Sequence, residues 1–433
     1  MAKHPGNGGE AGPLLTSKSY ARCPSRPDDE LRNFRSCLRW LCLDQSGSAG
    51  RTAASWAVFL LLSVAVPTLS HFVLAFGPHR RPYDLVVQLS LTSASALAFL
   101  TLSTVTRRYG LRRFLFLDKL PGESDRVRLG YTAQLSRSFR ILACFVAPCF
   151  AAEVAYKLWW YLSGAGRIPF IANPLLSDCV AFSLELASWI YRTASFFFSC
   201  VLFRLICHLQ ILRLEDFAVV FQGDSEVETL LREHLRLRRQ LKVISHRFRV
   251  FILVGLIMVT ASQFAATLVT LRPNSDDNLF NTGELALCSI VLVTGLFICL
   301  RSAAKITHKA QALTSRAAKW HVCATIDSFA IDLEKTSAIT SNPSFVLPAN
   351  EAEADTDEGE ASDIEELKCT KIVHDDVNTT TFQKRQALVT YLENNRAGIT
   401  IFGFTVDRAW LHTIFMLETT LFLWLLGKTI GIS

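Results

Sequence analysis

Apolar residues in this chain are gathered into long unbroken blocks rather than spread over the faces of amphipathic elements. Seven blocks come close to the length of about 20 residues that a helix needs to cross a hydrocarbon layer of about 30 Å. They cover residues 54–76, 84–105, 139–162, 179–207, 249–271, 284–301 and 399–427. The last block is too long for one crossing, because 29 helical residues reach about 43 Å. We therefore expect roughly its first eight to ten residues to lie in water. Residues 409–427 then form the span.

Lys and Arg residues outside the blocks set the orientation, because positive residues are retained on the cytoplasmic side. The segments 1–53, 106–138, 208–248 and 302–398 hold 33 of them, whereas the alternate segments hold 5. Without the long segment 302–398, where the rule weakens, the counts are still 23 and 5. The pattern predicts an all-α polytopic membrane protein with seven transmembrane helices, the N-terminus inside and the C-terminus outside. G-protein-coupled receptors have the opposite orientation.

The apolar periodicity of the fifth block continues into the cytosolic segment 208–248. Apolar or neutral residues recur there at a three-four spacing from Val227 to Phe251. A helix that keeps an apolar stripe beyond the bilayer must bury it against protein. We therefore expect a cytosolic layer of helical span extensions, in which subunits meet. His234 lies in this stripe, and we interpret it as a packing residue rather than a metal ligand.

The other segments divide by composition. Residues 1–27 are low in complexity and predict a disordered tail, followed over 28–53 by a juxtamembrane amphipathic helix. That helix lies on the inner leaflet or packs against other cytosolic segments. Residues 54–301 hold the first six spans.

The last two segments complete the cytosolic layer and the seventh span. Residues 302–398 predict anchor helices with a disordered insertion near 340–380, where residues 351–366 contain nine acids and no base. Residues 399–433 form the inner boundary and the last transmembrane helix.

Composition excludes an ordinary cytosolic enzyme. Half of the 433 residues are hydrophobic, mean hydropathy is +0.28, and 19% are charged against about 25% in soluble domains. No HExxH, GxSxG, Walker or kinase motif is present. We therefore expect no enzymatic activity and no cofactor or metal site. The twelve Cys residues form no CxxC pair and are interpreted as apolar packing residues. The net charge of +7 is explained by the inner loops, and no nucleic acid partner is expected.

A resemblance to a known family is carried by two segments, DELRNFRSCLRWLCLDQS and AGITIFGFTVDRAWLHTIFMLETTLFLWLLGKTIG. They resemble a plant family of gustatory receptor-like, seven-span membrane proteins of unknown function, related to insect gustatory and odorant receptors. The resemblance covers the chain from Asp28 onward. It implies a homotetramer with a cytosolic anchor built from extensions of spans four to seven, and a last helix that lines one central pore.

The insect receptors are ligand-gated cation channels, so the resemblance implies a chemoreceptor-like ion channel. Their last span carries a Thr-Tyr pair, five apolar residues and Gln-Phe. The nearest stretch here, TTLFLWLLG, lacks the Tyr and the Gln-Phe. Pore-lining residues are therefore not carried over one by one.

Several polar side chains lie within the predicted spans, where an isolated charge costs a few kcal/mol. Glu153 and Lys157 stand four residues apart on one helix face, in the favourable order. The polar residues of spans two, three and four fall in or near the outer half of the bilayer. Our hypothesis is that they form a ligand pocket that opens outward. Its residues are Gln88, Glu153, Lys157, Trp160, Glu185, Trp189 and Arg192. The alternative is a set of structural ion pairs, Glu153 with Lys157 and Arg192 with Glu185, beside an interfacial belt of aromatic residues.

The last span has one face on which hydroxyl and apolar residues alternate. At 100° per residue this face holds Thr413, Met416, Leu417, Thr420 and Trp424, while Glu418 points almost opposite. Around a fourfold axis such a face would line a narrow, neutral pore. The alternative is that these are ordinary helix-packing residues.

We therefore expect a multimeric, ligand-gated cation channel in the plasma membrane rather than an internal one. Its expected partners are membrane lipids, other copies of the chain in a homotetramer, and an unknown small-molecule ligand. The alternative function is a non-conducting membrane receptor or scaffold whose cytosolic layer recruits partners. A transporter is disfavoured, because the number of spans is odd and no paired halves are seen.

Overall fold

The computed structural model describes residues 41–42, 45, 49–75, 83–109, 124–162, 174–221, 226–271, 279–337 and 379–430. The predicted tail 1–27, most of the predicted helix over 28–53 and the predicted acidic insertion lie outside the described residues.

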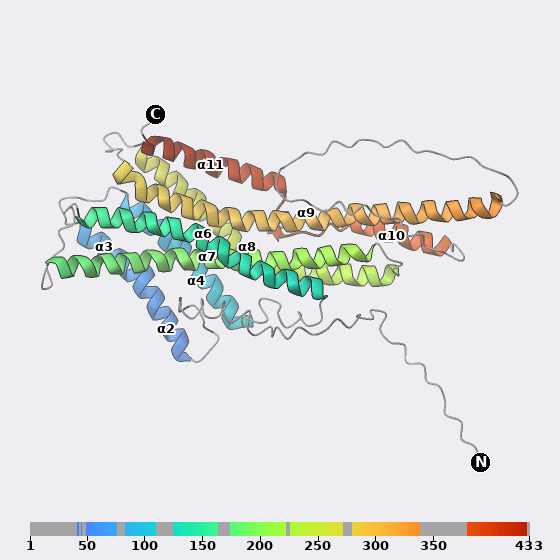
Figure 1. Ribbon diagram of the computed structural model, residues 1–433, viewed down its shortest axis with the longest axis horizontal. Coiled ribbons are helices and arrows are strands. Elements are labelled where there is room, and N and C mark those ends of the chain that lie inside the picture. Colours follow the sequence, from blue (N-terminus) through green and yellow to red (C-terminus); the bar gives the residue numbers. More distant parts are fainter. Residues whose placement is uncertain are drawn as a thin grey trace, which may run out of the picture.

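The described chain is almost entirely helical (Figure 1). The helices are α2 Ala49–Phe59, the π-helix η1 Leu60–Ala65, α3 Val66–Ala75, α4 Asp84–Tyr109, α6 Asp125–Leu162, α7 Pro174–Val220, α8 Val227–Thr270, α9 Leu279–Ser337, α10 Thr379–Asn394 and α11 Arg408–Ile430. The all-α class is confirmed, with one small exception. The strands β1 Thr400–Ile401 and β2 Phe404–Thr405 form a hairpin that the sequence pattern does not predict.

Six of the described helical stretches are long and apolar enough to cross a membrane. They are Ala49–Phe72, Asp84–Arg107, Leu129–Leu162, Leu176–Val220, Val227–Thr270 and Gly283–Ile326. The predicted seventh span corresponds to α11, which has 23 residues and is not among the six. It contains the polar residues Arg408, His412 and Glu418. "Inner" and "outer" below follow the orientation predicted from the Lys and Arg counts.

Three helices are far longer than the bilayer requires. α7 has 47 residues, α8 has 44 and α9 has 59, which corresponds to about 70, 66 and 89 Å. The parts of these helices beyond the predicted spans lie together at the right of Figure 1 and form a helical layer, in which α10 packs against α8 and α9. His234 of α8 lies there, 3% exposed, with its ring edge-on to that of Tyr391 of α10 at 5.8 Å.

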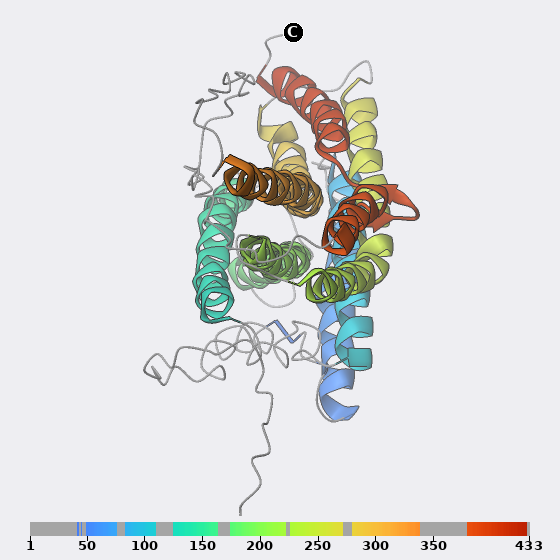
Figure 2. The same cartoon turned by 90° about the vertical axis from the view of Figure 1, so that its right-hand side faces the viewer.

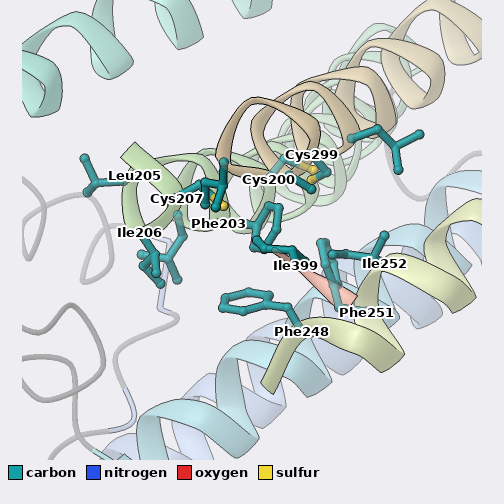
Figure 3. Close-up of a cluster of buried hydrophobic side chains, with 14 of the residues drawn as sticks. Cys200, Phe203, Leu205, Ile206, Cys207, Phe248, Phe251, Ile252, Cys299 and Ile399 are labelled. Carbon is teal, nitrogen blue, oxygen red and sulfur yellow. The ribbon is translucent and has the colours of Figure 1, made fainter. Parts of the chain in front are cut away.

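The core is built around α7, which packs against α4, α6, α8 and α9 (Figure 2). Figure 3 shows Cys200 of α7 beside Cys299 of α9, with Phe203 on the side toward α8. Phe203 and Phe248 of α8 place their ring centroids 4.8 Å apart. All of these side chains are buried, and both cysteines are free thiols. Small and aromatic side chains thus pack together between α7, α8 and α9.

α7 and α9 are in close contact at Gly295. A Cβ atom added there would lie 2.3 Å from Phe196 Cε1 of α7. Phe196 is itself buried, so its rigid ring has no free space into which it can turn. Gly283, in the same helix, has no atom within 4 Å of an added Cβ.

We predict that Gly295→Ala destabilises the folded protein by about 1–3 kcal/mol, because the added methyl group overpacks the α7–α9 contact. Gly283→Ala is the matched control and should be neutral or slightly stabilising, because Ala favours helix over Gly. The midpoint of thermal unfolding in detergent, followed by size-exclusion chromatography after heating, measures both effects. Equal midpoints for the two variants would contradict the close contact.

Candidate functional site

Polar side chains of the outer half meet around Lys157 of α6. Its Nζ atom lies 2.9 Å from Glu185 Oε2 of α7, 3.4 Å from Glu153 Oε1 and 3.9 Å from Glu284 Oε1 of α9. Lys157 is 2% exposed and Glu153 is fully buried. An ammonium group is costly to bury unless carboxylates and hydrogen bonds replace its water. Carboxylates from three helices provide that replacement here.

A second set of polar contacts runs from α7 through α4 to α3. Arg192 Nη1 donates a hydrogen bond to Gln88 Oε1 at 2.6 Å, and Gln88 Nε2 donates to Asp84 Oδ1 at 3.0 Å. The other Asp84 oxygen, Oδ2, lies 3.0 Å from His71 Nδ1. Arg192 and Asp84 are both buried. The guanidinium charge is therefore connected to a carboxylate through the Gln88 amide rather than directly.

The two sets form one outer polar cluster. Ser70 Oγ of α3 donates to Glu185 Oε1 at 2.5 Å, and so joins α3 to the contacts of Lys157. The Arg192 guanidinium also interacts electrostatically with three carboxylates, Glu153, Glu284 and Asp84. Among the described residues the cluster contains four carboxyl groups against two permanent cations and His71.

The structure brings five of the seven predicted pocket residues into direct polar contact, namely Gln88, Glu153, Lys157, Glu185 and Arg192. Of the two alternative ion pairs, Glu153–Lys157 forms. Arg192–Glu185 does not, because the polar contacts of Arg192 go to α4 and to the backbone of its own helix.

The tryptophans of this region separate into buried and exposed positions. Trp160 and Trp189 are buried, whereas Trp159 is 41% exposed. Trp189 lies beside Phe150 of α6, with ring centroids 6.4 Å apart. Trp159 therefore fits an interfacial belt, and the other two are packed inside the helix bundle near the cluster.

Sequence reasoning missed four members of the cluster, Ser70, His71, Asp84 and Glu284. Three of them stand near the outer ends of apolar blocks, where a charged side chain ordinarily reaches water and carries no signal. Their side chains point inward because of the way the helices pack against one another. The sequence pattern of a single helix does not predict this packing. No group of three or more His, Cys, Asp or Glu among the residues that the structure describes is placed to hold a metal ion.

The π-helix η1 lies beside this cluster and uses its backbone to bind neighbouring helices. Ser188 Oγ of α7 donates to the Leu62 carbonyl oxygen at 2.6 Å, and Thr92 Oγ1 of α4 donates to the Ser63 carbonyl oxygen at 3.1 Å. A π-turn has carbonyl groups displaced from the regular ladder, and such turns are frequent at functional sites. The carbonyl groups of η1 thus bind α4 at Thr92, which also accepts from Arg192, and α7 at Ser188, one turn before Arg192.

The last helix, α11, has two different faces. The predicted pore-face residues Thr413, Met416, Leu417, Thr420 and Trp424 are all exposed in the single chain. On the opposite face Glu418 is 1% exposed, and Thr260 Oγ1 of α8 donates to its Oε1 atom at 2.6 Å. Leu425, two turns further on, is fully buried. α11 is thus attached to the bundle along one side only.

Comparisons with known proteins agree with this architecture. Residues 29–417 match a protein family described as "Protein of unknown function (DUF3537)". No curated protein matches the chain. The olfactory receptor OR5 of the insect Machilis hrabei is similar in structure, with a TM-score of 0.56 and 12% identity over 92% of this chain and 99% of that one. The same receptor in complex with eugenol gives a TM-score of 0.52 and 12% identity, over 92% and 100% of the two chains.

At 12% identity the likeness to OR5 shows the fold alone. The family match, in contrast, extends over most of the sequence. The chain is therefore a multi-pass membrane protein with the fold of an insect olfactory receptor, and it belongs to the DUF3537 family.

Proposed function

We propose that this protein is a homotetrameric, ligand-gated cation channel with seven spans, in which α11 lines a central pore and the outer polar cluster receives a small-molecule ligand. The observation that carries the proposal is the two-faced character of α11 in a chain with an olfactory receptor fold. The homotetrameric state is proposed from the family resemblance that the two segments quoted under Sequence analysis carry.

The exposed face of α11 suits a narrow neutral pore. Thr413 Oγ1 and Thr420 Oγ1 donate to backbone carbonyl groups one turn earlier, at 3.0 and 2.7 Å. Their oxygen lone pairs therefore remain available outside the helix. Four copies of the face would present rings of hydroxyl oxygens about 10 Å apart along the axis. Such rings select cations by size and by oxygen ligands rather than by a charged ring.

The outer polar cluster suits a ligand site because it gathers buried charged and hydrogen-bonding groups from α3, α4, α6, α7 and α9. The receptor of the same fold was solved in complex with eugenol, which supports a small-molecule ligand for this chain as well. The cluster is buried, so a ligand must displace existing contacts when it binds. The ion pairs of Lys157 are the contacts that it would rearrange.

A physical connection leads from the cluster to the pore face. Glu284 stands at the outer part of α9, which packs along α11. The rings of Phe297 of α9 and Phe415 of α11 have centroids 4.9 Å apart. A shift of α9 at Glu284 would therefore move a helix that touches α11 directly. Glu418 keeps α11 attached to α8 during such a movement.

We predict that Thr420→Phe removes most of the cation current of the reconstituted protein in a planar bilayer, because four bulky rings would fill the pore. Thr420→Val should reduce it less, because it keeps the size and removes only the hydroxyl group. Leu268→Phe, at a position of α8 that is 65% exposed, is the control and should leave the current unchanged. Wild-type protein that carries no current at all would favour the non-conducting receptor or scaffold.

We further predict that Glu153→Gln abolishes ligand-induced stabilisation while the protein remains folded. The measurement is a thermal-shift screen of small amines and phenols, eugenol included, on purified wild-type protein. A ligand at 100 times its Kd stabilises the native state by about 2.7 kcal/mol. Ser262→Ala is the control, because it removes the hydrogen bond from Ser262 Oγ to Ser90 Oγ, which lies outside the cluster. A shift that survives Glu153→Gln unchanged would place the ligand elsewhere.

A further inference from the structure

Glu418 of α11 is a carboxyl group that is buried in a predicted span and has no charged partner among the described residues. Its side chain is 1% exposed and faces α8, on the side opposite to the exposed hydroxyl face. Its Oε1 atom lies 2.6 Å from Thr260 Oγ1, whereas no described group hydrogen-bonds to its Oε2 atom. Gln263, one turn further along α8, is also buried, but its amide group makes no hydrogen bond to Glu418.

The charged and titratable residues of α8 and α11 stand away from this contact. The nearest ones along the two helices are Arg249 of α8 and Arg408, His412 and Lys428 of α11. Arg249 is eleven positions from Thr260, and Arg408 and Lys428 are each ten positions from Glu418, which corresponds to about 15–16 Å along a helix. His412 is six positions from Glu418, but it is exposed on another face of α11.

The charged and titratable residues of α9, the other helix that packs against α11, are engaged elsewhere. Glu284 and Cys288 interact with the outer polar cluster, and Cys299 faces α7 (Figure 3). Arg301 is exposed, and its guanidinium group lies over the Phe297 ring at 6.0 Å. No cation of the three helices therefore compensates a negative charge on Glu418 within the part of the chain that the structure describes.

The Thr260 hydroxyl group has two oxygen neighbours and a single proton. Its Oγ1 atom lies 2.6 Å from Glu418 Oε1 and 2.9 Å from the Leu256 carbonyl oxygen of its own helix. Both distances are those of full hydrogen bonds between oxygen atoms. A carbonyl oxygen only accepts, and a hydroxyl group donates one proton. If Glu418 is ionised, Thr260 can therefore make only one of the two hydrogen bonds.

A protonated Glu418 resolves this conflict. The carboxyl group then donates to Thr260 Oγ1, and Thr260 donates to the Leu256 carbonyl oxygen, so that both short contacts are hydrogen bonds. Burial favours the same form, because an ionised carboxylate within a membrane needs a cation or water beside it. In the outer polar cluster Lys157 and Arg192 supply the cations. Since α8 of the same chain covers Glu418, a neighbouring copy does not reach it.

We propose that the contact between α8 and α11 is a proton-binding site, in which the Glu418 carboxyl group carries the proton and donates it in a hydrogen bond to Thr260. When the pH rises, the proton passes to the solvent, and the Thr260 hydroxyl turns from the Leu256 carbonyl oxygen to the carboxylate. An uncompensated charge then lies between the two helices, and their contact weakens. The site requires neither ion conduction nor a small-molecule ligand, so its test is independent of the proposed function.

The first test measures the midpoint of thermal unfolding of full-length wild-type protein and Glu418→Gln in lipid nanodiscs, from about pH 5 to pH 8. The native state holds a proton that the unfolded state releases. The folded-to-unfolded ratio of wild-type protein should therefore fall relative to that of Glu418→Gln, by up to about tenfold per pH unit. The wild-type midpoint should decrease accordingly, relative to that of the variant, as the pH rises.

Glu418→Gln should fold, because its amide group is neutral at every pH and donates to Thr260 as the protonated acid does. At the upper end of the pH range it should be at least as stable as wild-type protein. A difference between the two midpoints that stays constant with pH would overturn the proposal. A variant that fails to fold would also overturn it, because a neutral donor would then not replace the carboxyl group.

The second test detects the proton by infrared spectroscopy, since a protonated carboxyl group has a C=O stretching band that a carboxylate lacks. At neutral pH this band should be stronger in wild-type protein than in Glu418→Gln, and the difference should vanish at alkaline pH. Glu228→Gln is the matched control, because the Glu228 side chain is 70% exposed and pairs with Arg232. It should leave the band and the midpoints unchanged. Equal bands in wild-type protein and Glu418→Gln would contradict the assignment.

A third test separates a proton from a metal cation. At constant pH and ionic strength, sodium is replaced by N-methylglucamine, which is too bulky to enter between the two helices. The midpoint of wild-type protein should not change. A decrease in wild-type protein that is absent from Glu418→Gln would mean that the site takes a metal cation, and the assignment to a proton would be wrong.

Discussion

The buried ammonium group of Lys157 is the contact on which the outer half of this fold depends. It lies against carboxylates from α6, α7 and α9, and Ser70 extends the same contacts to α3. Removing one partner of such a pair leaves an uncompensated charge in a medium of low dielectric constant, at a cost of about 3–5 kcal/mol. The relative depth of these helices is therefore set by charge pairing, because apolar packing alone would tolerate small shifts along the helix axis.

The long helices and the polar residues of the spans could be predicted because they depend on local composition. The length of each apolar block predicts a span, and the three-four spacing after Val227 predicts the extension of α8. The pairing of Glu153 with Lys157 follows from their spacing on one helix. The contact of Arg192 with Gln88 joins residues 104 positions apart, and no pattern within one helix specifies it. For the same reason Glu284 was not recognised as a partner of Lys157.

Two local features escaped prediction because the backbone there departs from the regular periods. The π-helix η1 lies within an apolar block whose composition is equally suited to an α-helix, and Ser188 and Thr92 bond to its carbonyl groups from other helices. The hairpin turns at Phe402 and Gly403, which both have positive φ angles of 48° and 95°. A bulky residue is rare in that conformation. The Arg249 guanidinium stacks over the Phe402 ring at 4.9 Å and offsets part of the strain.

A buried ion pair seldom stabilises a protein more than apolar residues of the same volume would. Compared with apolar residues of the same volume, the outer polar cluster as a whole therefore adds little stability, although removing one of its members is costly. What it adds is a set of contacts with alternative pairings, because Lys157 lies within reach of three carboxylates and can favour a different one when a proton or ligand changes the charge of another. Since α9 supplies one of these carboxylates and also packs on α11, the proposed function would have a change of pairing at the outer end act through α9 on the helix with the exposed hydroxyl face.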